Sequence, residues 1–184
     1  MTELLEKYIE LLKQWNKYIN LVQANSLKDV KKRHIDDCLQ LTPYLPKEGT
    51  IFDIGSGAGF PGVILAIAGF NNLVLIEKDI KKAVFLKEVK RNLNLNYEIY
   101  NGDVYHLNTK KYKKPFFAIS RAFGSLQILI DIMKKLSIPN GLFHRGKNWQ
   151  FEITQLEMRN CNYEIIKSQL THDSVILKIQ CYYF

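Results

Sequence analysis

Helical spacing of apolar side chains dominates the first part of the chain. Between residues 3 and 22 these side chains recur every three or four positions, namely at Leu4, Leu5, Tyr8, Leu12, Trp15, Ile19 and Val22. Such spacing gives one continuous apolar face along a helix. A second helix is predicted from Leu27 to Leu45, because Ser26 can cap its first turn and Pro46 ends it. We therefore expect residues 1–48 to form a helical extension.

From residue 49 onward, short β-rich runs alternate with helical runs. We predict strands at 51–54, 73–76, 98–100, 116–120 and 142–144, and helices at 61–68, 80–93, 126–136 and 150–159. This alternation is typical of a parallel sheet with helices on both faces. Two final strands, 163–169 and 175–183, have too short a link for a crossover helix and must be antiparallel. The pattern predicts an α/β fold, a doubly wound and mostly parallel sheet with a C-terminal antiparallel hairpin. Residues 49–184 would form it, in one compact domain with the extension.

Charge and cysteine content indicate the kind of partner and the cellular compartment of the protein. Lys and Arg number 26 against 18 Asp and Glu, and the net charge of +8 favours a polyanionic partner, although solubility alone would also explain it. Cys38, Cys161 and Cys181 are odd in number and lack metal-site spacing, so we expect reduced thiols and no metal. The N-terminus lacks the apolar run of a signal peptide, and the apolar stretch 63–70 is too short to span a bilayer. We expect a cytoplasmic protein without membrane contact.

A glycine-rich loop follows the first predicted strand and is the strongest motif. Residues 53–62 read Asp-Ile-Gly-Ser-Gly-Ala-Gly-Phe-Pro-Gly. The dinucleotide pattern GxGxxG is not met, because Phe60 stands where its third glycine belongs. Asp53 suits a ligand with an ammonium group, such as the methionine part of S-adenosylmethionine, and would repel a pyrophosphate. A nicotinamide dinucleotide site and a purely structural turn remain as alternatives. The expected cofactor-binding residues of the loop are Asp53, Gly55, Ser56, Gly57, Gly59 and Phe60.

Two more anchors follow the second and third predicted strands. Glu77 ends the second strand, where a carboxylate can accept hydrogen bonds from both ribose hydroxyls of either cofactor. After the third strand, Asp103 could accept from an adenine amino group, and the amides of Val104 and Tyr105 could reach ring nitrogens. Instead of binding a ligand, Glu77 could be a solvated charge at the end of its strand, and Asp103 could belong to an ordinary turn.

Several segments resemble those of one known family along almost the whole chain. Residues 11–21 are similar to its LLxxWNxxxNL motif, 33–39 to RHxxDSL, 53–62 to DxGSGAGFPG, 81–86 to KKxxFL and 120–122 to SRA. The family is that of the bacterial 16S rRNA guanine-N7 methyltransferases, once called glucose-inhibited division protein B. Three positions depart from it: Cys38 replaces a Ser, Asp103-Val104-Tyr105 replaces an RxE-type segment, and Arg145 precedes Gly146 in place of Lys.

The resemblance implies a class I methyltransferase (Rossmann-like) fold with S-adenosyl-L-methionine as cofactor. It implies N7 of a guanine in 16S rRNA of the small ribosomal subunit as the methyl acceptor. Carried over to matching positions, it implies cofactor contacts by Gly55, Phe60, Val104, Tyr105 and Arg121. The sequence indicates no obligate protein partner. Rival functions are methylation of another RNA, a small molecule or a protein, a cofactor-binding RNA module without transfer activity, and an NAD(P)-linked oxidoreductase.

Methylation at guanine N7 sets few demands on side chains. N7 carries an unprotonated lone pair, so no general base is needed, and the protein must supply alignment and desolvation. Arg121, after the fourth strand, is the candidate for a positioning role, with a structural ion pair as the alternative. His34 with Asp36 could orient the extension over the pocket. Candidate RNA contacts, each of which could equally be a solvated charge, are Arg33, His34, Lys81, Lys82, Arg145 and Lys147.

Overall fold

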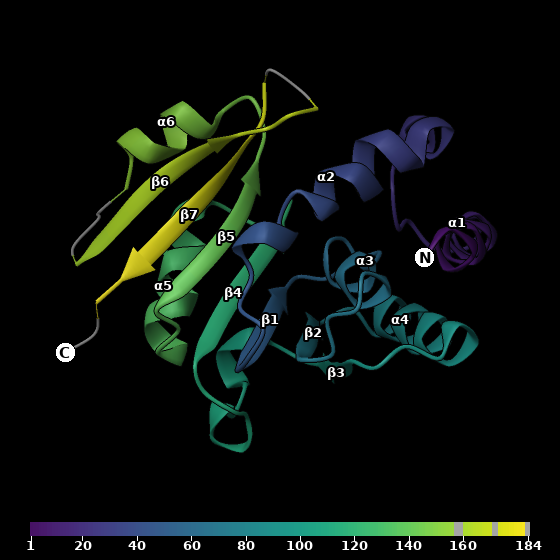
Figure 1. Ribbon diagram of the computed structural model, residues 1–184, viewed down its shortest axis with the longest axis horizontal. Coiled ribbons are helices and arrows are strands. Elements are labelled where there is room, and N and C mark those ends of the chain that lie inside the picture. The colour runs from purple at the N-terminus through teal and green to yellow at the C-terminus, as the bar shows by residue number, and fades with distance from the viewer. Residues whose placement is uncertain (157–159, 171–172, 183–184) are drawn as a thin grey trace.

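A seven-stranded sheet forms the centre of the computed structural model, which describes residues 1–156, 160–170 and 173–182 (Figure 1). The strand order is β3-β2-β1-β4-β5-β7-β6. Neighbours among the first five strands pair in parallel, whereas β7 is antiparallel to both β5 and β6. The predicted doubly wound sheet with an antiparallel end is confirmed. Strand bounds are β1 Thr50–Ile54, β2 Leu73–Glu77, β3 Glu98–Asn101, β4 Phe116–Arg121, β5 Asn140–Arg145, β6 Cys161–Lys167 and β7 Val175–Cys181.

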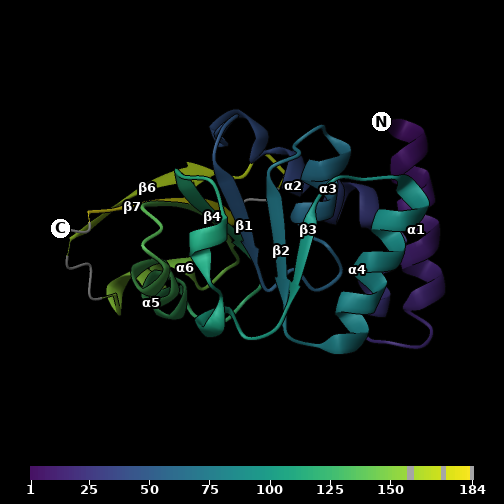
Figure 2. The same ribbon diagram turned by 90° about the horizontal axis from the view of Figure 1, so that it is seen from below.

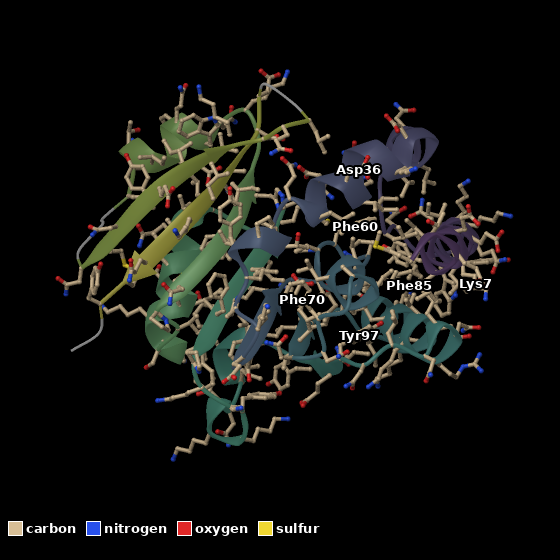
Figure 3. All side chains as sticks on the ribbon, viewed as in Figure 1. Lys7, Asp36, Phe60, Phe70, Phe85 and Tyr97 are labelled. Atoms are coloured by element: carbon tan, nitrogen blue, oxygen red, sulfur yellow. A yellow bond between two sulfur atoms is a disulfide. The ribbon has the colours of Figure 1, made fainter. Side chains whose placement is uncertain are left out.

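Helices cover both faces of the sheet, which explains why every residue of β1 and β2 is buried (Figure 2). One core joins α1, α3 and α4 to the sheet, and Phe85 and Tyr97 lie in it (Figure 3). The other core lies under α5 and α6. The helix bounds are α1 Thr2–Trp15, α2 Asp37–Leu39, α3 Gly62–Ile67, α4 Ile80–Leu93, α5 Leu126–Leu136 and α6 Trp149–Thr154.

Sheet topology fixes where a ligand can bind. The chain leaves β1 toward β2 on one side, while β4 and β5 lie on the other, so the strand order reverses between β1 and β4. In open α/β sheets ligands bind beyond the carboxyl ends of the strands at such a reversal. The glycine loop after β1 and Arg121 at the end of β4 both lie there.

The N-terminal extension differs from its prediction in two ways. The first helix ends at Trp15, because the side chain of Asn16 bonds to the backbone of Leu21 and Val22 and turns the chain. The single helix predicted from 27 to 45 is wrong. Its place is taken by 3₁₀ turns at Ala24–Asp29 and Thr42–Tyr44, a π-helical turn at Lys31–Asp36, and the short α2.

The spacing of buried residues explains the π-helical turn. Val30 and Ile35 are both buried although they stand five positions apart, and a π turn brings such positions onto one side. Ser26 does not cap a helix, since its hydroxyl donates to the carbonyl of Gln23.

The cysteine prediction is wrong for two of the three residues. Cys161 and Cys181 form a disulfide, and Cys38 is the buried thiol among the described residues. The pairing follows from the hairpin register, which sets Cys161 directly opposite Cys181 on β6 and β7. Residue spacing alone could not show this, because the register was unknown.

The described residues lack two features, a membrane-spanning helix and a metal-binding cluster. No helix there is long and apolar enough to cross a membrane. No group of three or more His, Cys, Asp or Glu side chains in the same part of the chain could hold a metal ion.

Candidate functional site

A cavity of about 480 Å³ opens at the carboxyl ends of β1 to β4. Its walls come from four loops that follow these strands and from the N-terminal extension. The lining residues are Leu21, Val22, His34, residues 54–58, Phe60, residues 76–78, Lys82, residues 102–105 and residues 121–123. Segments far apart in the sequence therefore meet at one site, as the strand order requires.

The glycine loop forms one wall of this cavity. Gly55 has a φ of +73°, and a Cβ atom there would stand 2.2 Å from Cδ2 of Phe123. Only glycine fits this position without strain and a clash. Loop amides are already engaged: those of Gly55 and Ser56 donate to the carbonyl of Ile76, and that of Gly57 donates to Glu77. A ligand here would therefore pack against the loop more than it would bond to these amides.

Glu77 lies at the end of β2 with its carboxylate fixed by main-chain donors. The amide of Gly57 donates to Oε2 at 2.8 Å, and the amide of Asp79 donates to Oε1 at 2.8 Å. The residue is buried but lines the cavity. Each carboxylate oxygen can accept more than one hydrogen bond, so Glu77 keeps capacity for a pair of hydroxyl groups.

Asp53 lies behind the cavity wall, outside the lining. It is fully buried, and its Oδ2 accepts from the amide of Gly62 at 3.1 Å, at the start of α3. Burial raises the pKa of Asp53 to about 7. Gly59 is also outside the lining, and a Cβ on it would meet Val63 at 2.4 Å. Asp53 and Gly59 were both predicted to bind the cofactor. They lie outside the cavity lining, where they shape the glycine loop.

The loop after β3 closes the opposite wall. Asp103 Oδ1 accepts from the amide of Tyr105 at 2.9 Å, which holds the loop in a tight turn. Of the two amides expected to reach an adenine ring, that of Tyr105 is thus already bonded. Val104 is buried, and Tyr105 is 37% exposed at the rim. The loop therefore presents an apolar edge to the cavity.

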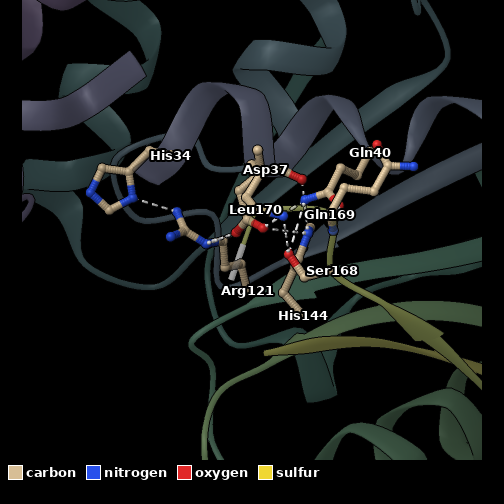
Figure 4. A network of polar contacts seen from close by, with 8 residues as sticks. All are labelled: His34, Asp37, Gln40, Arg121, His144, Ser168, Gln169 and Leu170. Atoms are coloured by element: carbon tan, nitrogen blue, oxygen red, sulfur yellow. Dashed lines mark hydrogen bonds and ion pairs between the residues drawn. The ribbon is translucent and has the colours of Figure 1, made fainter. Parts of the chain in front are cut away.

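Arg121 joins the cavity to a polar network that reaches the extension (Figure 4). Its Nε lies 3.2 Å from Oδ2 of Asp37, and its Nη1 lies 2.6 Å from Nδ1 of His34. The His34 ring stacks on Phe60 with centroids 4.7 Å apart, and the guanidinium lies 5.7 Å from the Phe60 centroid. Because an arginine only donates, Nδ1 of His34 accepts in this contact.

His144, at the carboxyl end of β5, also belongs to the network. Its Nε2 lies 3.0 Å from the backbone carbonyl of Asp37 and 3.6 Å from the Asp37 carboxylate. Burial lowers the pKa of His144, so the ring is neutral at pH 7 and Nε2–H can donate to the carbonyl.

A second cavity of about 690 Å³ adjoins the first at Arg121 and Ala122, which line both. Its lining comes from the ends of β4 and β5 and from α6. The residues are Asp37, Arg121, Ala122, Gly124, His144, Arg145, Gly146, Lys147, Asn148, Glu152, Leu170 and Ser174. The two cavities together form one site, and the lining of the second cavity includes the basic side chains of Arg121, Arg145 and Lys147.

Comparison with known proteins identifies the family. The model of the family described as rRNA small subunit methyltransferase G, GidB, matches residues 1–176. The chain belongs to this family. Relatives named ribosomal RNA small subunit methyltransferase G include those of Orientia tsutsugamushi strain Ikeda and Rickettsia bellii strain OSU 85-389. The Orientia protein is 39% identical over 178 residues, which cover 95% of this chain and 88% of the relative. The Rickettsia protein is 38% identical over 180 residues, with 96% and 92% covered.

Solved structures show that the fold is that of class I methyltransferases. The 16S rRNA methylase RmtB aligns with a TM-score of 0.61 at 14% identity over 99% of this chain and 76% of that one. A mutant of MtNAS in complex with S-adenosylmethionine aligns with a TM-score of 0.63 at 9% identity over 98% and 76%. At such low identity the likeness concerns architecture alone.

The candidate RNA contacts of this family member fall into three groups. Lys82 and His34 line the first cavity, and Arg145 and Lys147 line the second. Arg145 is buried in contacts with Glu152 and the carbonyls of Phe123 and Gly124. Lys81 is exposed, and the backbone of Arg33 lies in the π-helical turn. Lys147, 80% exposed in its side chain, lies 3.4 Å from Asp173.

Sequence reasoning missed several residues that line the two cavities. Asp37 and His144 were not singled out, nor were Leu21, Val22 and Phe123. Asp37 carried a signal, because it is the acidic position of the segment 33–39 that resembles RHxxDSL. Leu21 also carried one, because it ends the segment 11–21 that resembles LLxxWNxxxNL. Val22, Phe123 and His144 belong to none of the matched motifs, and only the folded chain brings them to the site.

Proposed function

We propose that this protein transfers the methyl group of S-adenosylmethionine to N7 of a guanine in 16S rRNA of the small ribosomal subunit. The observation that carries the proposal is the cavity between the glycine loop, Glu77 and residues 102–105, in a member of the small-subunit rRNA methyltransferase G family. The protein is an enzyme, and its cofactor is S-adenosylmethionine.

The lining residues fit this cofactor better than a dinucleotide. A volume of about 480 Å³ is within the usual range for a small-molecule site. A pyrophosphate needs free backbone donors at a glycine loop. Here the amides of Gly55, Ser56 and Gly57 bond within the protein, and that of Gly59 donates to the carbonyl of Ser56. We propose cofactor contacts by Gly55, Ser56, Gly57, Phe60, Glu77, Asp103, Val104, Tyr105 and Arg121.

The chemistry of the acceptor explains what the side chains must do. When bound, S-adenosylmethionine supplies an electrophilic methyl carbon and leaves as S-adenosylhomocysteine. Guanine N7 attacks with its own lone pair, so no side chain has to remove a proton. The residues of both cavities have to exclude water and hold N7, the methyl carbon and the sulfur nearly in line.

The second cavity would hold the target base, because Arg121 and Ala122 border both compartments. The guanidinium of Arg121 can hold guanine O6 or a phosphate group. It must not donate to N7, since a hydrogen bond there would occupy the attacking lone pair. The target nucleotide would have to be unpaired or turned out of its helix to enter.

Methyl transfer from labelled cofactor tests the proposal. Small ribosomal subunits that lack the modification are incubated with the protein, and the labelled base is mapped. Label at N7 of one guanine is expected. Label on protein, on a small molecule or on another RNA atom would contradict the proposal. A thermal-shift comparison separates the dinucleotide alternative, because S-adenosylhomocysteine should raise Tm and NAD should not.

The setting of the reaction is proposed from its substrate. We place the enzyme in the cytoplasm, where ribosomal subunits are found, and expect no membrane or obligate protein partner. We also propose that the chain consists of an extension, residues 1–48, and a methyltransferase core, residues 49–184. Contacts of His34 and Asp37 with Arg121 support a role for the extension in the site.

A further inference from the structure

The wall between the two cavities depends on a residue of the extension. Arg121 comes from the end of β4, and its side chain is about one-fifth exposed. The Asp37 side chain, 14% exposed, lies against its Nε. Both groups are thus largely withdrawn from water, where an ion pair constrains geometry more than an exposed pair does.

Several contacts fix Asp37 itself. Gln40 donates from Nε2 to its Oδ1 at 3.1 Å, and Nε2 of His144 lies 3.0 Å from its backbone carbonyl. Gln40 in turn accepts from the amide of Gln169 at 2.7 Å, and its Nε2 lies 3.4 Å from Oγ of Ser168 (Figure 4). The carboxylate is therefore anchored to β5 and to the segment that follows β6, independently of Arg121.

We infer that Asp37 is a positioning residue for methyl transfer, which holds the Arg121 guanidinium in the wall shared by the cofactor and substrate cavities. Nε contacts Asp37 and Nη1 contacts His34, and both partners come from the same short segment of the extension. Two contacts at different nitrogens fix the plane of a guanidinium as well as its position. The inference rests on the proposed function, because it assigns Arg121 to the substrate of that reaction.

Asp37→Asn tests the inference with little change in size. The amide can still accept from Gln40, but the negative charge facing Arg121 is lost. Asp36→Asn is the matched control, because it removes the same charge one position earlier. The sequence had suggested Asp36 as the partner of His34, but His34 contacts Arg121, and Asp36 makes none of the contacts described above. Four quantities are measured for each protein: kcat and KM with the rRNA substrate, the Kd of S-adenosylhomocysteine, Tm, and the NMR resonance of the Arg121 Nε–H, assigned with Arg121→Lys.

For Asp37→Asn we expect kcat/KM to fall about 10- to 100-fold, the range that small misplacements of a substrate-holding group produce. The Kd of S-adenosylhomocysteine should change less than about threefold, because Arg121 is one of nine proposed cofactor contacts and the other eight, the glycine loop and Glu77 among them, are untouched. The Arg121 Nε–H resonance should move, and Asp36→Asn should match the wild type in every measurement. Assays run well below the lower Tm keep the variants comparable.

Three results would overturn the inference. Unchanged kcat/KM in Asp37→Asn is the first, and an unmoved Arg121 resonance is the second. The third is an activity loss that follows a loss of folded protein or of cofactor affinity, which would mark Asp37 as merely structural. A wild-type protein that methylates no rRNA would refute the proposed function instead. The Arg121 resonance would then still report whether Asp37 holds the guanidinium.

Discussion

Gly55 links the backbone of the glycine loop to ligand binding. Its positive φ and the nearby Phe123 ring leave no room for a side chain. Gly69 offers a contrast, because its φ is +103° while nothing lies within 4 Å of its Cβ position. The same substitution at the two glycines therefore separates backbone strain from damage to the cavity.

We predict that Gly55→Val abolishes binding of S-adenosylhomocysteine while the chain still folds. Backbone strain alone should lower the free energy of unfolding by about 1–3 kcal/mol in both Gly55→Val and Gly69→Val. Only the first variant should lose affinity, by at least about tenfold in a titration, because only there must Phe123 and the loop move. Equal affinity in the two variants would mean that the cavity does not bind the cofactor.

Asp53 makes stability depend on pH. Its carboxyl has a pKa of about 7 in the folded chain because it is buried, and an ordinary acidic pKa once unfolded. Between these values the folded state binds more protons, so stability from this group is lost as pH rises. Relative to Asp53→Asn, the wild type should lose about 2–3 kcal/mol of unfolding free energy between pH 5 and pH 8. Urea unfolding of both proteins measures this, and a constant difference across that range would contradict the assignment.

Residue patterns predicted much of the first cavity but not its depth. Gly55, Glu77 and Val104 were expected there because they lie at or after the carboxyl ends of predicted strands. In a parallel sheet this edge is where ligands bind. Asp53 was expected at the ligand from its charge. Sequence could not show that its carboxylate turns inward to the amide of Gly62.

At the level of elements, the loop between α1 and the first 3₁₀ turn is held by one side chain. Asn16 Oδ1 accepts from the amides of Leu21 and Val22 at 2.9 Å each, and its Nδ2 donates to the carbonyl of Val22 at 3.1 Å. Leu21 and Val22 line the cofactor cavity. Asn16 thereby ties the end of α1 to the site.

Asn16→Ala is predicted to weaken cofactor binding through this loop. Loss of three hydrogen bonds should let Leu21 and Val22 move, and the Kd of S-adenosylhomocysteine should rise about 3- to 30-fold, the equivalent of one or two net hydrogen bonds. Asn20→Ala serves as the control, because Asn20 is exposed on the same loop. Calorimetric titration measures both variants, and an Asn16→Ala affinity equal to that of Asn20→Ala would refute the role.

Elements with strong local signals were predicted well. The bounds of α4 and α5 are those expected, since Asp79 and Ser125 cap them and apolar residues recur along them. The extension was predicted less well. Its residues 24–44 fold as short turns whose geometry depends on packing against the core, and no local pattern distinguishes such turns from a continuous helix.

For the molecule as a whole, the positive charge should govern affinity for RNA. The net charge is +8, and lysines border the site at positions 78, 82 and 147. We predict that affinity for a 16S rRNA fragment falls at least about tenfold between 50 and 200 mM salt, because each neutralised phosphate releases counterions. Fluorescence anisotropy measures it. Cofactor affinity is the internal control and should stay nearly constant. An RNA affinity that does not change with salt would contradict this prediction.

The architecture, unlike the hairpin cross-link, could be predicted from the order of elements. Alternating strands and helices dictate a parallel sheet, and the short link before β7 dictates an antiparallel end. The disulfide could not be predicted, because it depends on which residue of β6 faces Cys181. The second cavity was also beyond prediction, since it exists only where the extension, β5 and α6 meet.

A crystal structure with S-adenosylhomocysteine bound tests the central claim most directly. The ribose hydroxyls should lie within hydrogen-bond distance of the Glu77 carboxylate, and the adenine should lie against Val104. The sulfur should face Arg121 and the second cavity. A ligand bound elsewhere, or a ribose out of reach of Glu77, would contradict the assignment of this site.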